Sequence, residues 1–415
     1  MKLNTTVSRI ALSLALAIGV AGAGLIAAPL AIAAEKPPTV TAAVGKPLTE
    51  AMNLLKAGKA KEAQVEAQKA VAASKTPYEQ LVSNQILINA SLKATDYNSA
   101  AKAIEAAIAT GQLKPEESIS FSKTLTQIYY QQKNYPKTIE SAQAYLKAVP
   151  NDPEASVLIG QSYYLTNDFK KSAEFLKGYI KSSDSAGKPV REDTLTLLMS
   201  ADYKLNDDAA VRTDLEMLQT RYPKPQYMKD FIQMTEKDLR AANLSTKNTL
   251  DVFTVKFNAG LITEPKDYAG LTELALQDGL PGLAKKVMDK GMADGVLGTG
   301  AQKDRELRMA TMAKTQAETD QKGLAAGEAE AAKAKTGEAL IKYGEAYATY
   351  GMFDKAVAAT EAGVAKGVAD KDDGQLRLGI VYIQAGQRAK ALEAFKQITP
   401  GTPAAKLASL WRLQK

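Results

Sequence analysis

Two stretches near the carboxyl end of the chain repeat one pattern of small and aromatic residues, with an offset of 35 positions at every matched pair. The pairs are Gly344 and Gly379, Tyr347 and Tyr382, Gly351 and Gly386, and Ala356 and Ala391. A fixed period of about 20 to 50 residues is typical of solenoids, whose units bury their apolar faces against their neighbours. The pattern therefore predicts a stack of repeated units.

The spacing inside each copy predicts a pair of helices. A small residue at Gly344 lets the next helix approach closely, and Tyr347 lies almost one turn further along the same stripe. Gly351 can supply the left-handed turn that ends the first helix. Ala356 then lets the second helix cross against the first, and each pair stacks on the next.

Earlier copies of the pattern can be located with similar offsets. Beside Gly160, for example, Tyr163 occupies the place that Tyr347 occupies beside Gly344, and Ala173 lies within one position of the place that corresponds to Ala356. From the clearest copy to the weakest, the earlier copies are marked by Gly160, Thr126, Ser200, Ile88 and Ala51. A helical repeat therefore extends over most of the chain.

These residues resemble the tetratricopeptide repeat, whose signature places Leu-Gly, Tyr, Ala, Phe and Pro over a period of about 34 residues. The best copy matches at Leu378, Gly379, Tyr382, Ala391 and Phe395, whereas the Trp position of the signature is never filled by Trp. The resemblance covers residues 115–180 and 337–398 most closely. It implies an all-α fold, a solenoid of helical hairpins with a concave groove.

The copies fall into two groups, which we predict to form two helical arrays joined by a helical connector. The N-terminal array covers 47–240 and the C-terminal array covers 265–415, where it ends in a closing helix. The connector, 241–264, is predicted to be helical because no run of Gly, Ser or Pro separates the two halves.

Two segments need a separate interpretation. Residues Leu250 to Phe257 alternate as a strand would, but apolar residues at steps of three and four favour a helix. Residues Lys314 to Lys335 are rich in Ala, Lys, Glu and Gly. They predict an exposed helical hairpin with a break near Gly323.

The first 33 residues predict a secretory signal peptide. Lys2 and Arg9 precede an apolar run, and Ala31-Ile32-Ala33 fits the small-x-small cleavage pattern. We expect cleavage there, a flexible lead-in over 34–46, no integral membrane span in the mature chain, and a periplasmic or secreted bacterial protein. The alternative is an uncleaved anchor, because the apolar run is nearly long enough to span a bilayer.

The chain contains no cysteine and no histidine. Their absence excludes a thiolate nucleophile, a zinc site with sulfur or imidazole ligands and a Ser-His-Asp triad. The acidic pairs at 116–117, 207–208 and 372–373 fit helix N-termini better than a metal or acid–base site. The sequence thus predicts no catalytic residue, no metal and no cofactor, and a net charge of +7 is too weak to predict nucleic-acid binding.

The repeat resemblance turns one face of the first helix of each unit toward the concave groove. Tyr130 and Tyr164 lie on this face, 34 residues apart, and Gln127 and Gln161 precede them by three. We name the predicted set the polar-aromatic strip, which comprises Asn89, Lys93, Lys123, Gln127, Tyr130, Gln131, Gln161, Tyr164 and Lys204. The matching C-terminal positions are small, acidic or apolar, namely Glu345, Ala348, Ile380 and Ile383. The alternative for the strip is a solvated groove without a ligand.

The sequence predicts a non-catalytic exported scaffold that binds a protein or an extended peptide in the groove. A first alternative is an envelope-associated binder of glycans or cell-wall fragments, in which Tyr130 and Tyr164 stack on sugar faces. A second, less favoured, is an enzyme that uses only carboxylates or lysine.

Overall fold

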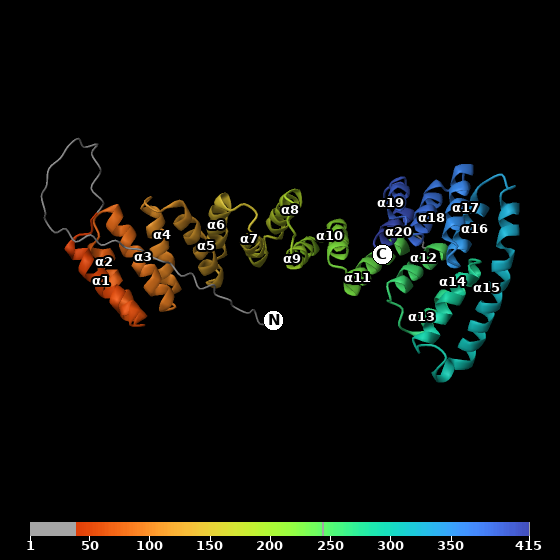
Figure 1. Ribbon diagram of the computed structural model, residues 1–415, viewed down its shortest axis with the longest axis horizontal. Coiled ribbons are helices and arrows are strands. Elements are labelled where there is room, and N and C mark those ends of the chain that lie inside the picture. Colours follow the sequence, from red (N-terminus) through yellow and green to blue (C-terminus); the bar gives the residue numbers. More distant parts are fainter. Residues whose placement is uncertain (1–38, 243–244, 415) are drawn as a thin grey trace, which may run out of the picture. The chain divides into compact units, whose positions relative to one another are not determined.

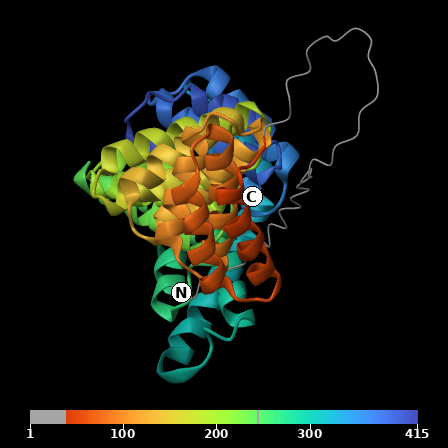
Figure 2. The same cartoon turned by 90° about the vertical axis from the view of Figure 1, so that its left-hand side faces the viewer.

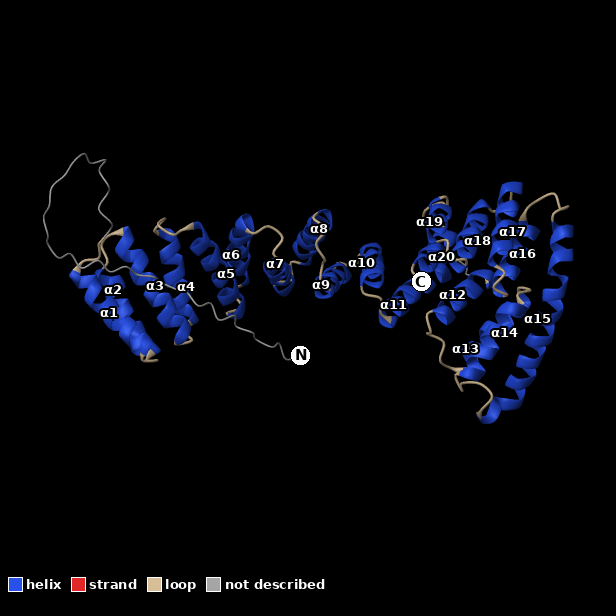
Figure 3. Cartoon of the chain, viewed as in Figure 1, coloured by secondary structure: helices blue, strands red, loops and turns tan. Residues whose placement is uncertain are grey.

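The computed structural model describes residues 39–242 and 245–414. In these residues the regular elements are 20 α-helices and one short 3₁₀ helix, with no strand (Figure 3). None of these helices is long and apolar enough to cross a membrane. The predicted signal peptide and its predicted cleavage site lie outside the described residues. The chain is an all-α helical-repeat solenoid, as predicted.

The chain divides into two compact units, 1–113 and 114–415. The first unit contains two antiparallel helix pairs, which Figure 2 shows nearest the viewer in red and orange. Its helices are α1 (Ala42–Lys56), α2 (Ala60–Ala73), α3 (Pro77–Lys93) and α4 (Tyr97–Ala109). Helix α2 buries only alanines, Ala63, Ala67 and Ala70, so it lies close against its neighbours α1 and α3.

The second unit begins with three helix pairs and a single helix (Figure 1). Their bounds are α5 (Pro115–Gln131), α6 (Tyr135–Ala148), α7 (Pro153–Leu165), α8 (Phe169–Ser185), α9 (Glu192–Lys204), α10 (Asp208–Arg221) and α11 (Pro225–Ala241). Each helix packs against the next in the chain. The helices from α5 to α11 are therefore stacked in the order in which they follow one another in the sequence.

The remaining helices of this unit do not simply continue that order. They are α12 (Thr246–Asn258), α13 (Pro265–Gln277), α14 (Pro281–Ala293), η1 (Gly300–Gln302), α15 (Lys303–Ala331), α16 (Glu338–Thr349), α17 (Phe353–Lys366), α18 (Lys371–Gln384), α19 (Arg388–Lys396) and α20 (Pro403–Arg412). The last of them, α20, packs against α11, α12 and α18 (Figure 1). The limits of the two predicted arrays and of the connector stay a prediction.

Close contact at the glycine of each repeat is confirmed. A Cβ atom at Gly344 would lie 1.9 Å from Thr360 Oγ1, and one at Gly379 would lie 2.1 Å from the ring of Phe395. At Gly160 a Cβ would lie 2.6 Å from Leu176. Real Cβ atoms do not come this close to a neighbour, so a larger residue at any of these three positions would force the packed side chain of the partner helix to shift.

The turn inside each helix pair adopts the left-handed conformation. Gly351 and Gly386, which the sequence predicts for this role, have φ of 74° and 73°. Asn167 has φ 60°, but Thr95 occupies the same kind of turn with φ 57°. A β-branched residue is strained in this region, whereas glycine is not.

We predict that Thr95→Gly stabilises the first unit by about 1 kcal/mol, because relief of left-handed strain exceeds the added backbone entropy of the unfolded chain. The matched control is Gly386→Ala, which has open space for its Cβ but keeps φ 73°, so it should destabilise by about 1 kcal/mol. Denaturant midpoints measure both changes. If Thr95→Gly destabilises the protein, the claim that Thr95 is strained in its left-handed conformation is wrong.

The predicted break near Gly323 is wrong. Helix α15 continues without interruption from Lys303 to Ala331, and Gly323 lies inside it. The helix buries a narrow stripe against α14 and α16 that includes Ala313, Ala317 and Leu324. Tertiary packing along this stripe outweighs the weak helix propensity of one glycine. The helix predicted around Leu250 is confirmed as α12.

The closing helix α20 covers an apolar surface made by distant segments. Leu407 and Trp411 are 0% and 2% exposed, and they belong to the same buried cluster as Phe231 of α11, Val252 of α12 and Ile380 of α18. The carboxyl end of the chain is therefore held against helices that precede it by more than 150 positions. The predicted helix at the end of the chain is therefore present, and it packs against α11, α12 and α18.

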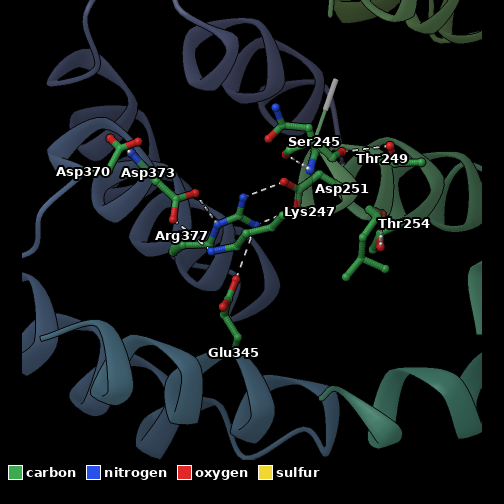
Figure 4. A network of polar contacts seen from close by, with 11 residues as sticks. Ser245, Lys247, Thr249, Asp251, Thr254, Glu345, Asp370, Asp373 and Arg377 are labelled. Atoms are coloured by element: carbon green, nitrogen blue, oxygen red, sulfur yellow. Dashed lines mark hydrogen bonds and ion pairs between the residues drawn. The ribbon is translucent and has the colours of Figure 1, made fainter. Parts of the chain in front are cut away.

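A buried ion pair joins the same segments (Figure 4). The guanidinium of Arg377 on α18 donates two hydrogen bonds to the carboxylate of Asp251 on α12, each 2.6 Å long. It also donates to Glu345 at 3.3 Å and to Asp373 at 2.9 Å. Lys247 binds the far side of Asp373 at 2.9 Å.

Burial and charge act against each other in this network. Burial disfavours the charged guanidinium, but the three acids hold the pKa of Arg377 well above its ordinary value. Burial raises the pKa of Glu345 despite the opposing effect of Arg377. The arginine therefore stays charged, and the acids around it must stay close for the site to remain stable.

We predict that Arg377→Met destabilises the fold by about 3–5 kcal/mol, because it leaves Asp251 buried without a cation. The double variant Arg377→Met with Asp251→Leu should recover most of the loss. Lys247→Met is the control, since this lysine is 36% exposed and its ion pair contributes about 1 kcal/mol or less. Denaturant unfolding of the parent, the single variants Arg377→Met and Asp251→Leu and the double variant gives the coupling. Equal losses for Arg377→Met and the control Lys247→Met would contradict the prediction.

Candidate binding groove

The structure brings the central residues of the polar-aromatic strip together across α5 and α7. The hydroxyl of Tyr130 donates a hydrogen bond to Gln161 Oε1 at 2.8 Å. The amide of Gln127 donates to Glu154 at 3.1 Å. These contacts link α5 and α7, which are the first helices of two successive repeats. The two helices therefore present one continuous polar surface.

Tyr130 and Tyr164 each pack against a neighbouring aromatic ring in an edge-to-face arrangement. Tyr130 meets Tyr135 edge-on with ring centroids 6.1 Å apart, and Tyr164 meets Phe169 edge-on at 5.1 Å. Burial, with a smaller effect of Tyr135, raises the pKa of Tyr130, so its hydroxyl stays protonated and continues to donate to Gln161. Both rings are half-buried and have fixed orientations.

Lys123 is neutralised by acids at the start of α7. Its ammonium lies 3.2 Å from Glu154 and 3.8 Å from Asp152, and 5.6 Å from the centre of the Tyr145 ring. Burial would lower the pKa of Lys123, but the bond to Glu154 and the nearby acids raise it overall. The lysine is therefore a fixed cation, unsuited to nucleophilic chemistry.

The other strip residues have different surroundings. Gln131 is exposed at the end of α5 and Lys204 at the end of α9. Asn89 is half-buried and Lys93 exposed, and both lie on α3 in the unit 1–113. The strip residues that the structure brings into contact with one another therefore lie on α5 and α7.

Sequence reasoning missed two features of this surface. Asp152 and Glu154 complete its polar network, but they stand at a helix start and resemble ordinary capping residues. Tyr203 occupies a repeat position where tyrosine normally packs, yet it is 69% exposed. Repeat spacing alone could not show this exposure, because the spacing of Tyr203 matches that of the packed tyrosines.

The matching positions of the C-terminal repeats are covered by the chain itself. Ile380 is 5% exposed in the cluster that contains Val252 and Leu407, and Ala348 is 8% exposed. Glu345 is bound by Arg377. Residues of α12 and α20 thus lie where a groove ligand would contact Ile380, whereas the strip on α5 and α7 has no contact with these two helices.

The acidic pairs have the structural role that the sequence indicates. Glu116 and Glu117 lie in the first turn of α5, Asp372 and Asp373 in the first turn of α18, and Asp207 caps α10. In the part of the chain that the structure describes, no group of three or more acids is arranged to hold a metal ion.

Comparison with a known family agrees with this geometry. Residues 124–187, from within α5 to just beyond α8, match the family model of the tetratricopeptide repeat. They include the Gly160 contact and the bonded pair of Tyr130 and Gln161. The predicted resemblance is confirmed, and this part of the chain carries the tetratricopeptide repeat.

Solved structures that resemble the chain do so at low identity. The Naa15/Naa10 complex bound to HypK-THB is 14% identical over 88% of this chain, which spans 65% of that one, with a TM-score of 0.30. A tetratricopeptide repeat protein from Parabacteroides merdae is 11% identical over 82% of this chain and 98% of its own, with a TM-score of 0.31. The TPR2AB-domain:pHSP90-complex of yeast Sti1 is 12% identical over 72% and 99%, with a TM-score of 0.26. Scores this low carry no functional argument, and no curated protein matches the chain.

Proposed function

We propose that this protein is a non-catalytic scaffold that binds an extended segment of another protein along the polar-aromatic strip of α5 and α7. Repeats of this family commonly mediate contacts between proteins. The observation that carries the proposal is the contrast between the two groups of repeats. In the C-terminal repeats Ile380 is buried against α12 and α20 and Ala348 is buried as well, whereas the strip residues on α5 and α7 are joined to one another and remain half-buried or exposed.

The chemistry of the strip suits an extended peptide. Exposed amides of Gln127 and Gln131 can both donate to and accept from a peptide backbone. Tyr130 and Tyr164 supply rigid aromatic area at little entropic cost, because neighbouring rings already fix them. Since Lys123 is neutralised, the strip selects by shape and hydrogen bonding more than by charge.

The signal-like first 33 residues support a periplasmic or secreted location for this scaffold. A partner would then be another exported or surface protein. The absence of any cysteine is compatible with an oxidising compartment, because no thiol is available for unwanted disulfide exchange.

We predict that Tyr130→Ala with Tyr164→Ala weakens partner capture at least about tenfold, because it removes the two rigid anchors of the groove. Quantitative pull-down from cells that express the tagged full chain measures the change. Lys170→Ala, an exposed substitution on the neighbouring α8 and outside the strip, is the control and should leave capture unchanged. Helix content by circular dichroism should match the parent in both variants.

Unchanged capture by the double tyrosine variant would contradict the proposal that the strip on α5 and α7 binds the partner. Retention of the parent on cell-wall material, with no polypeptide captured, would instead favour the glycan alternative, in which the same rings stack on sugars. Because both readings use Tyr130 and Tyr164, the chemical nature of the captured molecule decides between them.

A further inference from the structure

Two aspartates face each other inside the third helix pair of the second unit. Asp202 on α9 and Asp214 on α10 are each only 1% exposed. The Oδ2 atom of each accepts no hydrogen bond from the described residues. Buried carboxylate oxygens in a folded protein normally have donors, so the Oδ2 atom of Asp214 in particular needs an explanation.

One cation serves both acids. The ammonium of Lys177 on α8 lies 3.0 Å from both oxygens of Asp202, and its side chain is 48% exposed. If both aspartates were ionised, two negative charges would share a site with a single, partly solvated positive charge. Two like charges buried beside one another cannot both persist without great cost.

Other charged groups around the pair are already engaged. Asp207 in the turn between α9 and α10 caps Ala210, and it adds further negative potential. On the faces of α10 toward α11 and α20, the charged groups pair among themselves, as Arg212 with Asp238, Lys237 with Asp208, and Arg412 with Glu216. On α8, Asp184 pairs with Arg221. From α7 the neighbouring contribution is the aromatic ring of Tyr164.

A proton shared between the carboxyl groups accounts for all of these observations. The Asp214 carboxyl can donate to Asp202, which gives a partner to otherwise orphaned oxygens and reduces the charge of the pair to match Lys177. Burial first, then the hydrogen bond and the charge of Asp202, raises the pKa of Asp214 to about 8.

We propose that Asp202 and Asp214 form a proton-binding site that fastens α9 to α10, and that this helix pair loosens when the site loses its proton. Asp202 lies one position before the exposed Tyr203 and two before Lys204 of the strip. Loss of the proton therefore acts directly on the end of α9, next to the proposed groove.

The direction of the pH effect follows from the raised pKa. The unfolded chain releases this proton near the ordinary pKa of aspartate, about 4, whereas the folded pair keeps it to about pH 8. The stabilisation is complete below the unfolded pKa and declines as pH rises toward the folded pKa. In this window the opening equilibrium of the helix pair should rise about tenfold per pH unit.

The test is hydrogen exchange of the full chain, followed by mass spectrometry of peptides from α9 and α10 between pH 5 and 8 and corrected for intrinsic exchange. The parent should show an opening constant that rises with pH. Asp214→Asn keeps a permanent hydrogen-bond donor, so its opening constant should be nearly independent of pH. Asp208→Asn, an exposed change on the same helix, should behave as the parent.

Equal pH dependence in the parent and in Asp214→Asn would overturn the proposal. Infrared spectroscopy of the parent gives a readout that does not depend on a variant that folds. A protonated carboxyl band should persist at pH 7 and disappear as pH rises beyond 8. If no such band is present at pH 7, both aspartates are ionised and the site does not hold a proton.

Discussion

Close approach of paired helices at one small residue per repeat is the contact on which the rest of this structure depends. At Gly344 and Gly379 the space for a side chain is already filled by Thr360 and Phe395 of the partner helix. This contact fixes the distance and the crossing of each pair, and the pair in turn determines which face of its first helix remains available. The strip residues Tyr130 and Gln161 meet because their helices are stacked in this way.

The same packing produces different surfaces in different repeats. On α5 and α7 the available face carries amides and tyrosines, and hydrogen bonds between the two helices hold Tyr130 to Gln161 and Gln127 to Glu154. In the C-terminal repeats the face carries Glu345, Ala348 and Ile380; Arg377 binds Glu345, and residues of α12 and α20 cover Ile380. Arg377 and Asp251 fix that cover by a buried ion pair, whose desolvation cost is offset only if every member stays in place.

Much of the fold could be predicted from the sequence because repeat spacing reports directly on helix packing. The glycines at 160, 344 and 379, the left-handed turns at 351 and 386, and the closing helix all follow from local pattern. The continuity of α15 through Gly323 could not be predicted in this way, since long-range packing against α14 and α16 decides it. The pairing of Arg377 with Asp251, 126 positions apart, and of Asp202 with Asp214 leaves no periodic signal, because charged partners need no fixed spacing.

The central claim is that ligands reach the strip on α5 and α7 and do not reach the covered face of the C-terminal repeats. Site-specific photo-crosslinking in intact cells tests it most directly, with a benzophenone amino acid at Gln131, which is exposed, or at Ile383, which packs against the apolar clusters. We predict crosslinks to a separate molecule from position 131 and only crosslinks within the chain from position 383. Intermolecular crosslinks from position 383, with none from position 131, would contradict the account.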